Sequence, residues 1–330
     1  MMASLLPLDH GAVTFQHPAN HYVALPRVLT EHEYHTMSAV AFEPGFWNRA
    51  VAHAAYGFQQ SYFEPDFELT EQIGWGLNDR DFLMQMAPRI EALARPFCAW
   101  LITLSLHHPF DDFPDRHKEL KLGALENTSF GNYLHTMHFF DRALAEFTAE
   151  LARAGLLDDT IMVVFGDHDA GFALDPNLAR MVGIGPDQAS WLLADRIPLF
   201  IRLPAGSSAG EGDPYLLAAP AGQTDFAPTM LALLGIDPAP LPYIGRNLLG
   251  KRDDSPVLRP YGDWIDRAHL MIASGGRDRS CYEMASQSFA DARACADANA
   301  QARTAREVSR LVITEDLQES FRTQLAADPP

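Results

Sequence analysis

The sequence has few cysteines, an excess of acidic over basic residues, and no long hydrophobic run, and each of these features excludes a class of protein. Its three cysteines, Cys98, Cys281 and Cys295, form no Cys-x-x-Cys pair of the kind that holds zinc. With 25 basic and 43 acidic residues, the formal charge of −18 excludes a basic nucleic-acid-binding stripe and a polybasic membrane anchor. No stretch approaches the roughly 20 apolar residues of a membrane-spanning helix.

Residues 1–7 contain no basic residue and only a short apolar run, so we do not expect a signal peptide there. The sequence alone then leaves two interpretations, a cytosolic protein or a piece of a longer one. Cys281 and Cys295 are close enough in sequence to form a disulfide in an oxidising compartment, and two unpaired thiols are the alternative. At 330 residues and 47% hydrophobic content, the chain can bury the core of one large domain or of two.

The clearest pattern is the five-residue apolar run 161–165, in which three residues are β-branched. A run without alternation predicts a strand covered on both faces, in the middle of an α/β sheet. Ligands bind at the carboxyl ends of strands in such sheets, and here Asp167, His168 and Asp169 follow. A carboxylate beside an imidazole suits Zn²⁺ or Mn²⁺. The alternative is that the two aspartates cap a turn while His168 faces solvent.

A second apolar run, 97–106, also predicts a strand, and it ends in His107 and His108. If the two strands are parallel neighbours, His107 and His168 lie at one rim of the sheet. Between them, residues 132–154 have helical apolar spacing and end at Gly155, so we expect a right-handed βαβ unit. Two further histidines of this helix, His135 and His138, fall off its apolar face, so we expect them to be solvated.

A turn at 43–45 precedes Phe46-Trp47-Asn48-Arg49. The guanidinium of arginine can donate two hydrogen bonds to one phosphate or carboxylate. A neighbouring tryptophan can form the wall of a pocket. The alternative is an aromatic plug whose arginine extends toward solvent.

The rest of the chain predicts a third strand at 197–203 and a helix at 226–234 that is capped by residues 222–225. Residues 206–210 match the Gly-x-Ser-x-Gly string of hydrolases, but Gly and Pro follow where a helix is required, so we interpret them as a loop. Beyond residue 250 we expect a small antiparallel strand or hairpin near 261–263 and helices within 284–323.

Five of these segments occur in the order found in one family, and together they resemble the extracytoplasmic domain of lipoteichoic acid synthases and related bacterial phosphoglycerol transferases. That family belongs to the sulfatase/alkaline-phosphatase-like superfamily. The resemblance covers residues 4–250, and it is carried by the following segments: 46–49 (FWNR), 104–110 (LSLHHPF), 133–151, 165–168 (FGDH) and 222–229 (GQTDFAPT).

The resemblance implies an α/β fold with a central, mostly parallel sheet flanked by helices. Residues 1–250 would form the catalytic domain without its N-terminal part, and residues 251–330 a small C-terminal subdomain and helical tail. It also implies one divalent cation, usually Mn²⁺, with Mg²⁺ and Zn²⁺ as other candidates. Asp167 and His168 match metal ligands, while Trp47, Arg49 and His107 match residues that line the substrate-phosphate pocket.

The implied activity is transfer of a glycerol-phosphate group from the anionic lipid phosphatidylglycerol to a glycan or lipid acceptor of the cell envelope. The family's threonine nucleophile and one metal-binding glutamate lie upstream of the segment that matches residues 4–7, and Thr14 and Thr30 fall outside the nucleophile's motif. We therefore expect an N-terminally truncated and essentially inactive chain, since loss of a nucleophile costs about 10⁴–10⁶ in rate. The complete protein would be periplasmic or extracytoplasmic, and membrane helices that this sequence lacks would tether it to the inner membrane.

Three other functions compete with this one. A sulfatase requires a Cys/Ser-x-Pro-x-Arg string, and none surrounds the three cysteines. A phosphoethanolamine transferase or a phosphodiesterase of the same superfamily would share most of the site. A degenerate, non-catalytic binding domain is the third alternative.

Overall fold

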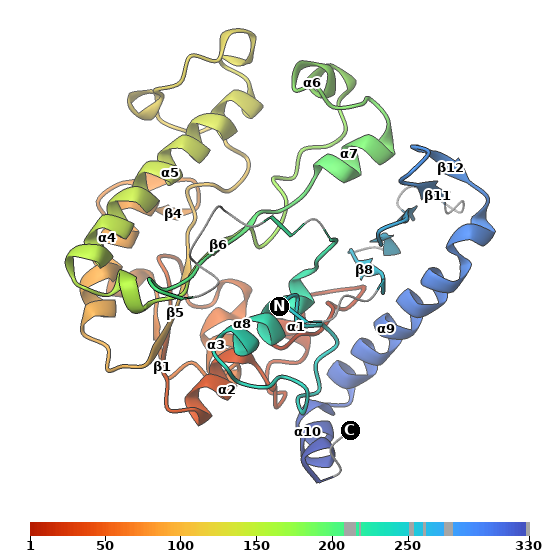
Figure 1. Cartoon of the computed structure of the whole chain (residues 1–330). Coiled ribbons are helices and arrows are strands. Elements are labelled where there is room, and N and C mark those ends of the chain that lie inside the picture. The colour runs from red at the N-terminus through yellow and green to blue at the C-terminus, as the bar shows by residue number, and fades with distance from the viewer. Residues whose placement is uncertain (208–215, 218, 251–253, 260–261, 274–279, 328–330) are drawn as a thin grey trace.

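The computed structural model describes residues 1–207, 216–217, 219–250, 254–259, 262–273 and 280–327. Helices flank a parallel sheet in the N-terminal half, and a smaller antiparallel sheet with two helices forms the C-terminal part (Figure 1). None of the described helices combines the length and the apolar character needed to cross a membrane.

The parallel sheet has the strand order β2-β1-β5. Its central strand is β1 (His35–Val40), which pairs with β2 (Gln60–Tyr62) on one edge and with β5 (Phe97–Ile102) on the other. All residues of β1 after the first are buried. This is the burial expected of a strand that is paired on both edges and covered on both faces.

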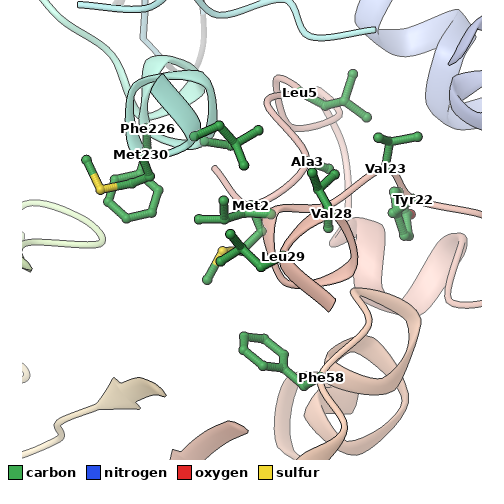
Figure 2. Packing of buried hydrophobic residues seen from close by; sticks show 14 of the residues in the cluster. Met2, Ala3, Leu5, Tyr22, Val23, Val28, Leu29, Phe58, Phe226 and Met230 are labelled. Carbon is green, nitrogen blue, oxygen red and sulfur yellow. The ribbon is translucent and has the colours of Figure 1, made fainter. Parts of the chain in front are cut away.

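Two hydrophobic cores cover the two faces of this sheet. The first core joins the N-terminal segment to α2 (Leu25–Glu31) and α8 (Phe226–Leu233), as the packing of Met2, Val28 and Phe226 shows (Figure 2). The second core joins the sheet to α4 (Asp79–Glu91) and α5 (Ser129–Arg153). The predicted α/β class, a central parallel sheet with helices on it, is confirmed.

The strand predicted at 161–165 forms as β6 (Met162–Phe165), but its pairing differs from the prediction. It pairs with β7 (Leu199–Arg202) in an antiparallel two-stranded sheet, and none of the described strands pairs with its other edge. Its residues are therefore only half-buried. An apolar run predicts that a strand packs on two faces, but it does not specify the direction of the neighbouring strand.

Helix α5 also corrects one expectation. Its bounds agree with the predicted helix to within three residues, and the Thr128 hydroxyl caps it by accepting the Gly131 N–H. However, His135 is buried rather than solvated, because the segment before the helix folds back over it and places Phe113 against the imidazole. His138 remains half-exposed, as predicted.

The C-terminal part contains an antiparallel sheet of order β12-β11-β10-β9-β8, whereas the sequence predicted only a strand or hairpin. A disulfide joins Cys281 of β11 to Cys295, which settles the two alternatives left open by the sequence. Of the segment 261–263, Tyr261 lies outside the described residues. The strands are β8 (Val257–Leu258), β9 (Trp264–Ile265), β10 (His269–Ile272), β11 (Ser280–Glu283) and β12 (Ser288–Ala290).

The last two helices, α9 (Ala296–Thr314) and α10 (Gln318–Ala327), return to the N-terminal half (Figure 1). Ser309 accepts the Leu6 N–H at 2.8 Å, and Gln318 donates to the Ala3 carbonyl at 2.8 Å. A division at residue 250 into two domains stays a prediction.

Short elements complete the chain. Residues 208–210 of the Gly-x-Ser-x-Gly string lie outside the described part. The short elements are α1 (Val13–Gln16), α3 (Arg49–Ala55), α6 (Pro176–Met181), α7 (Gln188–Ala194), β3 (Gln72–Ile73), β4 (Gly76–Leu77), and the 3₁₀ turns η1 (Phe46–Asn48), η2 (Glu64–Asp66), η3 (Asp115–His117), η4 (Gly123–Leu125), η5 (Leu157–Asp159), η6 (Gln223–Asp225) and η8 (Ala292–Cys295).

Candidate functional site

The candidate site lies where β5 and β6 end, and the two histidines predicted to share a rim do meet there. The rings of His107 and His168 contact each other edge to face, with centroids 5.3 Å apart. The ring of His108 lies 4.5 Å from that of His107 and 6.5 Å from that of His168. Three imidazoles from two separate loops therefore form one cluster.

Backbone carbonyls fix the proton position on two of these rings. The Nδ1 of His168 lies 2.5 Å from the Asp169 carbonyl oxygen, and the Nδ1 of His107 lies 2.8 Å from the His108 carbonyl oxygen. A carbonyl only accepts, so each Nδ1 must carry the proton. Each neutral ring then presents the lone pair of its Nε2, which is the arrangement of a metal-binding or proton-accepting histidine.

Asp167 supplies a carboxylate beside this cluster. Its Oδ1 lies 3.8 Å from the Nε2 of His168, and its side chain is 71% exposed. Gln223 of η6 donates a hydrogen bond from its side-chain amide to the Asp167 carbonyl. The segment 222–225, which the sequence analysis identified only as a helix cap, thus also holds the loop that carries Asp167.

Arg49, at the start of α3, places a positive charge near Asp167. Its Nη1 is buried and has no hydrogen-bond partner among the described residues. Burial lowers the pKa of the guanidinium, and the negative charge of Asp167 opposes that shift. A buried guanidinium N–H without a partner is costly, and an anion that accepts from it would remove the cost.

Trp47 does not reach the histidines directly. Its side chain is half-exposed and contacts the rings of Phe46 and Phe15, with centroids 6.0 and 6.1 Å away. Phe46 in turn contacts Trp75, whose ring lies 4.1 Å from that of His107. Trp47 is therefore the outer end of an aromatic row that leads to the histidine cluster.

Trp75 is a site residue that the sequence reasoning missed. It lies in the tight β3–β4 turn, directly after Gly74, whose φ of +67° favours glycine. Its indole N–H donates to the His108 carbonyl at 2.9 Å, so it anchors the histidine loop as well as packing on His107. The available signal was a tryptophan between two glycines, Gly74-Trp75-Gly76, which is typical of a side chain presented by a turn.

Asp79, the first residue of α4, is a second residue that the sequence reasoning missed. It is fully buried, and its Oδ1 accepts the N–H groups of Leu104 and Ser105 at 2.8 and 2.9 Å. Its own N–H donates to the Ser105 hydroxyl oxygen at 2.9 Å. These bonds hold the chain between β5 and His107, so Asp79 positions the histidine without touching the site.

The donor set at the rim suits a divalent cation only in part. Asp167 and His168 offer a carboxylate and a free Nε2, which are suitable ligands for Mn²⁺, Mg²⁺ or Zn²⁺. Across the part of the chain that the structure describes, no group of three or more His, Cys, Asp or Glu residues is placed to hold a metal. The described residues thus offer two candidate ligands, and a complete metal site would need further ones.

Comparison with known structures identifies the class of fold. A lipoteichoic acid synthase from Listeria monocytogenes superposes with a TM-score of 0.82 and 23% identity, covering 95% of this chain and 78% of that one. A protein of the alkaline phosphatase superfamily from Vibrio parahaemolyticus superposes with a TM-score of 0.71 and 24% identity, covering 94% and 74%. The fold is therefore that of the alkaline phosphatase and sulfatase group.

The sequence comparisons give the family within this class. The family model described as Sulfatase matches residues 1–236, and the chain belongs to the sulfatase family. Lipoteichoic acid synthase 1 of Bacillus subtilis is 30% identical over 274 residues, which are 82% of this chain and 42% of that protein. A lipoteichoic acid synthase-like protein of the same organism is 28% identical over 323 residues, 95% of this chain and 50% of the relative.

The resemblance predicted from the sequence is thereby confirmed. The chain spans about half the length of these curated relatives or less.

Proposed function

We propose that this chain forms the phosphate-holding and part of the metal-holding site of a glycerol-phosphate transferase. The observation that carries the proposal is the buried, unpartnered Nη1 of Arg49, next to the charge of Asp167 and in the same fold as the lipoteichoic acid synthases. Membership of the sulfatase family and similarity to lipoteichoic acid synthase 1 of Bacillus subtilis support the proposal.

Asp167 and His168 would hold a divalent cation, with Mn²⁺ as first choice and Mg²⁺ or Zn²⁺ as the others. When bound, such a cation supplies charge neutralisation at phosphoryl oxygens and lowers the pKa of a coordinated hydroxyl. The Nδ1–H of His168 is held by the Asp169 carbonyl, so this residue keeps its Nε2 directed away from the backbone.

Arg49 and His107 would bind the non-reacting oxygens of the substrate phosphate. The guanidinium donates from Nη1, which has no other partner among the described residues, and it keeps its positive charge at any physiological pH. Trp75 packs against His107 and limits the rotation of its ring. Trp47, at the outer end of the aromatic row, would contact the glycerol group or the lipid to which the phosphate is attached.

The reaction needs a nucleophile, and we propose that none of the 330 residues supplies it. Transfer of a phosphoryl group depends on positioning and on stabilising charge, which the rim provides, and on an attacking oxygen. We propose that the donor is phosphatidylglycerol, that the acceptor is a glycan or lipid of the cell envelope, and that the complete protein acts at the extracytoplasmic face of a membrane.

The direct test offers the purified chain a fluorescent phosphatidylglycerol analogue with Mn²⁺ and follows lipid products, while glycerol-phosphate binding is measured in parallel. We expect binding that depends on Arg49 and no turnover. Turnover by the chain alone would show that a nucleophile is present. Absence of binding by both the native chain and the Arg49→Gln variant would refute the proposed site.

A binding domain without catalytic activity is the second candidate, and one observation favours it. Among the described residues, no group of three or more His, Cys, Asp or Glu side chains is placed to hold a metal, and the proposed pair Asp167 and His168 is fewer than a complete site needs. Calorimetry with Mn²⁺ separates the two candidates, since a degenerate site gives no heat with the native chain.

A further inference from the structure

Trp47 and Asn48 adopt a backbone conformation that residues other than glycine rarely occupy. Trp47 has φ +53° and ψ +24°, and Asn48 has φ +51° and ψ +34°, so two consecutive residues lie in the left-handed region. The Cβ atom crowds the following carbonyl oxygen in this region, so the conformation costs free energy. Asparagine tolerates it better than most residues do, but a bulky tryptophan does not. Contacts with other parts of the chain must therefore hold this left-handed pair.

The pair lies between Phe46 and Arg49, whose side chains contact each other. The guanidinium carbon of Arg49 lies 5.2 Å from the centre of the Phe46 ring, which is a cation–π contact. Phe46 packs edge to face on Phe42 and Trp75, with ring centroids 4.9 and 5.3 Å away. The backbone between Phe46 and Arg49 therefore decides where the guanidinium lies.

Asn48 directly precedes α3, a position from which an asparagine side chain usually accepts an N–H of the helix. Here the side chain makes no such capping bond. Its Nδ2 instead donates to the backbone carbonyl of Thr14 in α1, at 2.7 Å. The Asn48 amide thus joins two segments that are 34 residues apart in sequence.

Helix α1 contacts both residues of the left-handed pair. Its Thr14 carbonyl accepts from Asn48, and the ring of the next residue, Phe15, lies 6.1 Å from the ring of Trp47. Phe15 is 57% exposed, and none of the four residues of α1 is buried. These contacts therefore do not belong to a hydrophobic core, and they bear on the conformation of the pair.

Backbone hydrogen bonds close the turn around the pair. The Asn48 N–H donates to the Gly45 carbonyl at 2.9 Å, the Ala50 N–H donates to the Pro44 carbonyl at 3.0 Å, and the Arg49 N–H donates to the Phe46 carbonyl. All three bonds lie within residues 44–50, so they shape the turn without tying it to another element. The bond from the Asn48 amide does tie it to another element, α1.

We propose that Asn48 is a positioning residue: its amide, anchored on the Thr14 carbonyl, holds the left-handed pair and thereby keeps the guanidinium of Arg49 in place at the candidate site. Asn48 acts through Arg49 and needs no contact with the substrate. The inference deepens the proposed function and rests on it for its role in phosphate binding, because Arg49 is the proposed phosphate-binding group.

Asparagine combines the two properties that this position requires. It tolerates the left-handed region, and its side-chain NH₂ can donate to a carbonyl oxygen. Glycine would meet only the first requirement, because it has no side-chain donor. Aspartate has nearly the same shape but, when ionised, offers only acceptors to the Thr14 carbonyl. These two replacements therefore remove the anchor and leave the backbone free to adopt the same conformation.

Loss of the anchor should weaken anion binding without removing any group that binds the anion. Only chains in which the turn is correctly folded present Arg49 to the ligand, and the apparent dissociation constant rises as that fraction falls. For Asn48→Gly we expect the affinity for glycerol phosphate, measured by calorimetry, to fall about threefold to tenfold, the factor that corresponds to one hydrogen bond.

Asn127→Gly is the matched control. Asn127 also has a positive φ, +62°, but it is exposed and lies just before α5. This variant should bind glycerol phosphate as the native chain does.

A double-mutant cycle distinguishes positioning from a general structural role. Arg49→Lys removes the planar fork of donors, so Asn48 then has no guanidinium to position. In the Arg49→Lys background we expect Asn48→Gly to change the affinity by less than about twofold. A merely structural asparagine would lower the affinity by the same factor in both backgrounds.

Hydrogen exchange of the chain without ligand provides a second, independent readout. In Asn48→Gly the amides of Arg49 and Ala50 should exchange about threefold to tenfold faster than in the native chain, while those of α4 keep their rates. If Asn48→Gly fails to fold, Asn48→Asp takes its place in this measurement. If the native chain does not bind glycerol phosphate, the proposed function fails, and the exchange rates still decide whether Asn48 holds the turn.

Three results would overturn the inference. The first is an equal affinity of the native chain and Asn48→Gly for glycerol phosphate. The second is an equal loss of affinity in the native and Arg49→Lys backgrounds. The third is an unchanged exchange rate at Arg49 and Ala50 when the Asn48 amide is removed.

Discussion

The imidazoles of His107 and His168 meet edge to face, although the strands that precede them share no ladder among the described residues. The contact depends instead on the loops that follow each strand. Asp79 holds one loop through the N–H groups of Leu104 and Ser105, and Gln223 holds the other through the Asp167 carbonyl.

Replacement of His168 by alanine removes the Nε2 that is presented beside Asp167. We expect the heat of Mn²⁺ binding in isothermal calorimetry to be lost, because a single carboxylate binds the ion weakly. His32→Ala, a change of an exposed histidine at the end of α2, is the matched control and should bind as the native chain does. Equal heats from all three proteins would contradict the role of His168.

Arg49→Lys keeps a positive charge but removes the planar fork of donors, and with it the partnerless Nη1. Affinity for glycerol phosphate should fall tenfold to a hundredfold, measured by calorimetry or by competition with labelled phosphate. Arg180 is exposed, and its side chain donates a hydrogen bond to Asn177; it provides the control variant Arg180→Lys. An unchanged affinity in Arg49→Lys would mean that charge alone, and no specific donor, holds the anion.

Ionisation of the buried Asp79 carboxyl should lower the free energy of unfolding as the pH rises. Burial raises its pKa from 3.8 to about 6 in the folded state, so between these values the folded chain binds more protons than the unfolded chain. Stability therefore decreases as the pH rises through this window, by at most about 3 kcal/mol.

The variant Asp79→Asn should remove this slope and keep an oxygen for the Leu104 and Ser105 N–H groups. Urea unfolding between pH 4 and pH 7 measures the effect. Asp112→Asn, at an exposed position, should leave the slope in place.

The disulfide between Cys281 and Cys295 closes a loop with a sequence separation of 14 residues in the C-terminal sheet. Replacing both cysteines by alanine should lower the free energy of unfolding by about 3 kcal/mol, the value expected for a loop of this length. A reducing agent should lower the free energy of unfolding of the native chain by the same amount, and it should leave that of the double variant unchanged. Cys98→Ala, which leaves the disulfide intact, should respond to the reducing agent as the native chain does.

Local patterns in the sequence predicted much of the site. The apolar runs before His107 and His168 identified the two strands that end at the rim, and the apolar spacing of residues 132–154 identified α5. These signals depend on neighbouring residues, so they can be read without knowledge of the tertiary contacts. The assignment of roles to Trp47, Arg49, His107, Asp167 and His168 stays a prediction.

The errors arose where a partner distant in the sequence decides the outcome. The direction of β7 against β6 is set by packing that the run 161–165 does not encode. His135 is buried because of Phe113, which belongs to another segment. Trp75 and Asp79 act on the loop after β5 from far away in the sequence. The hydrogen bond from Trp75 to His108 spans 33 residues, and the one from Leu104 to Asp79 spans 25.

Gln318 has a consequence for how the chain is made. Its side chain accepts from the Val23 N–H and donates to the Ala3 carbonyl, so a residue of α10 fills hydrogen bonds in a segment that is translated 295 to 315 residues earlier. Contacts across nearly the full sequence are slow to form, since a long loop must close before they are gained. During synthesis these backbone groups of the first core therefore lack their side-chain partner until α10 is made, and a chaperone that shields the early segment would act in that interval.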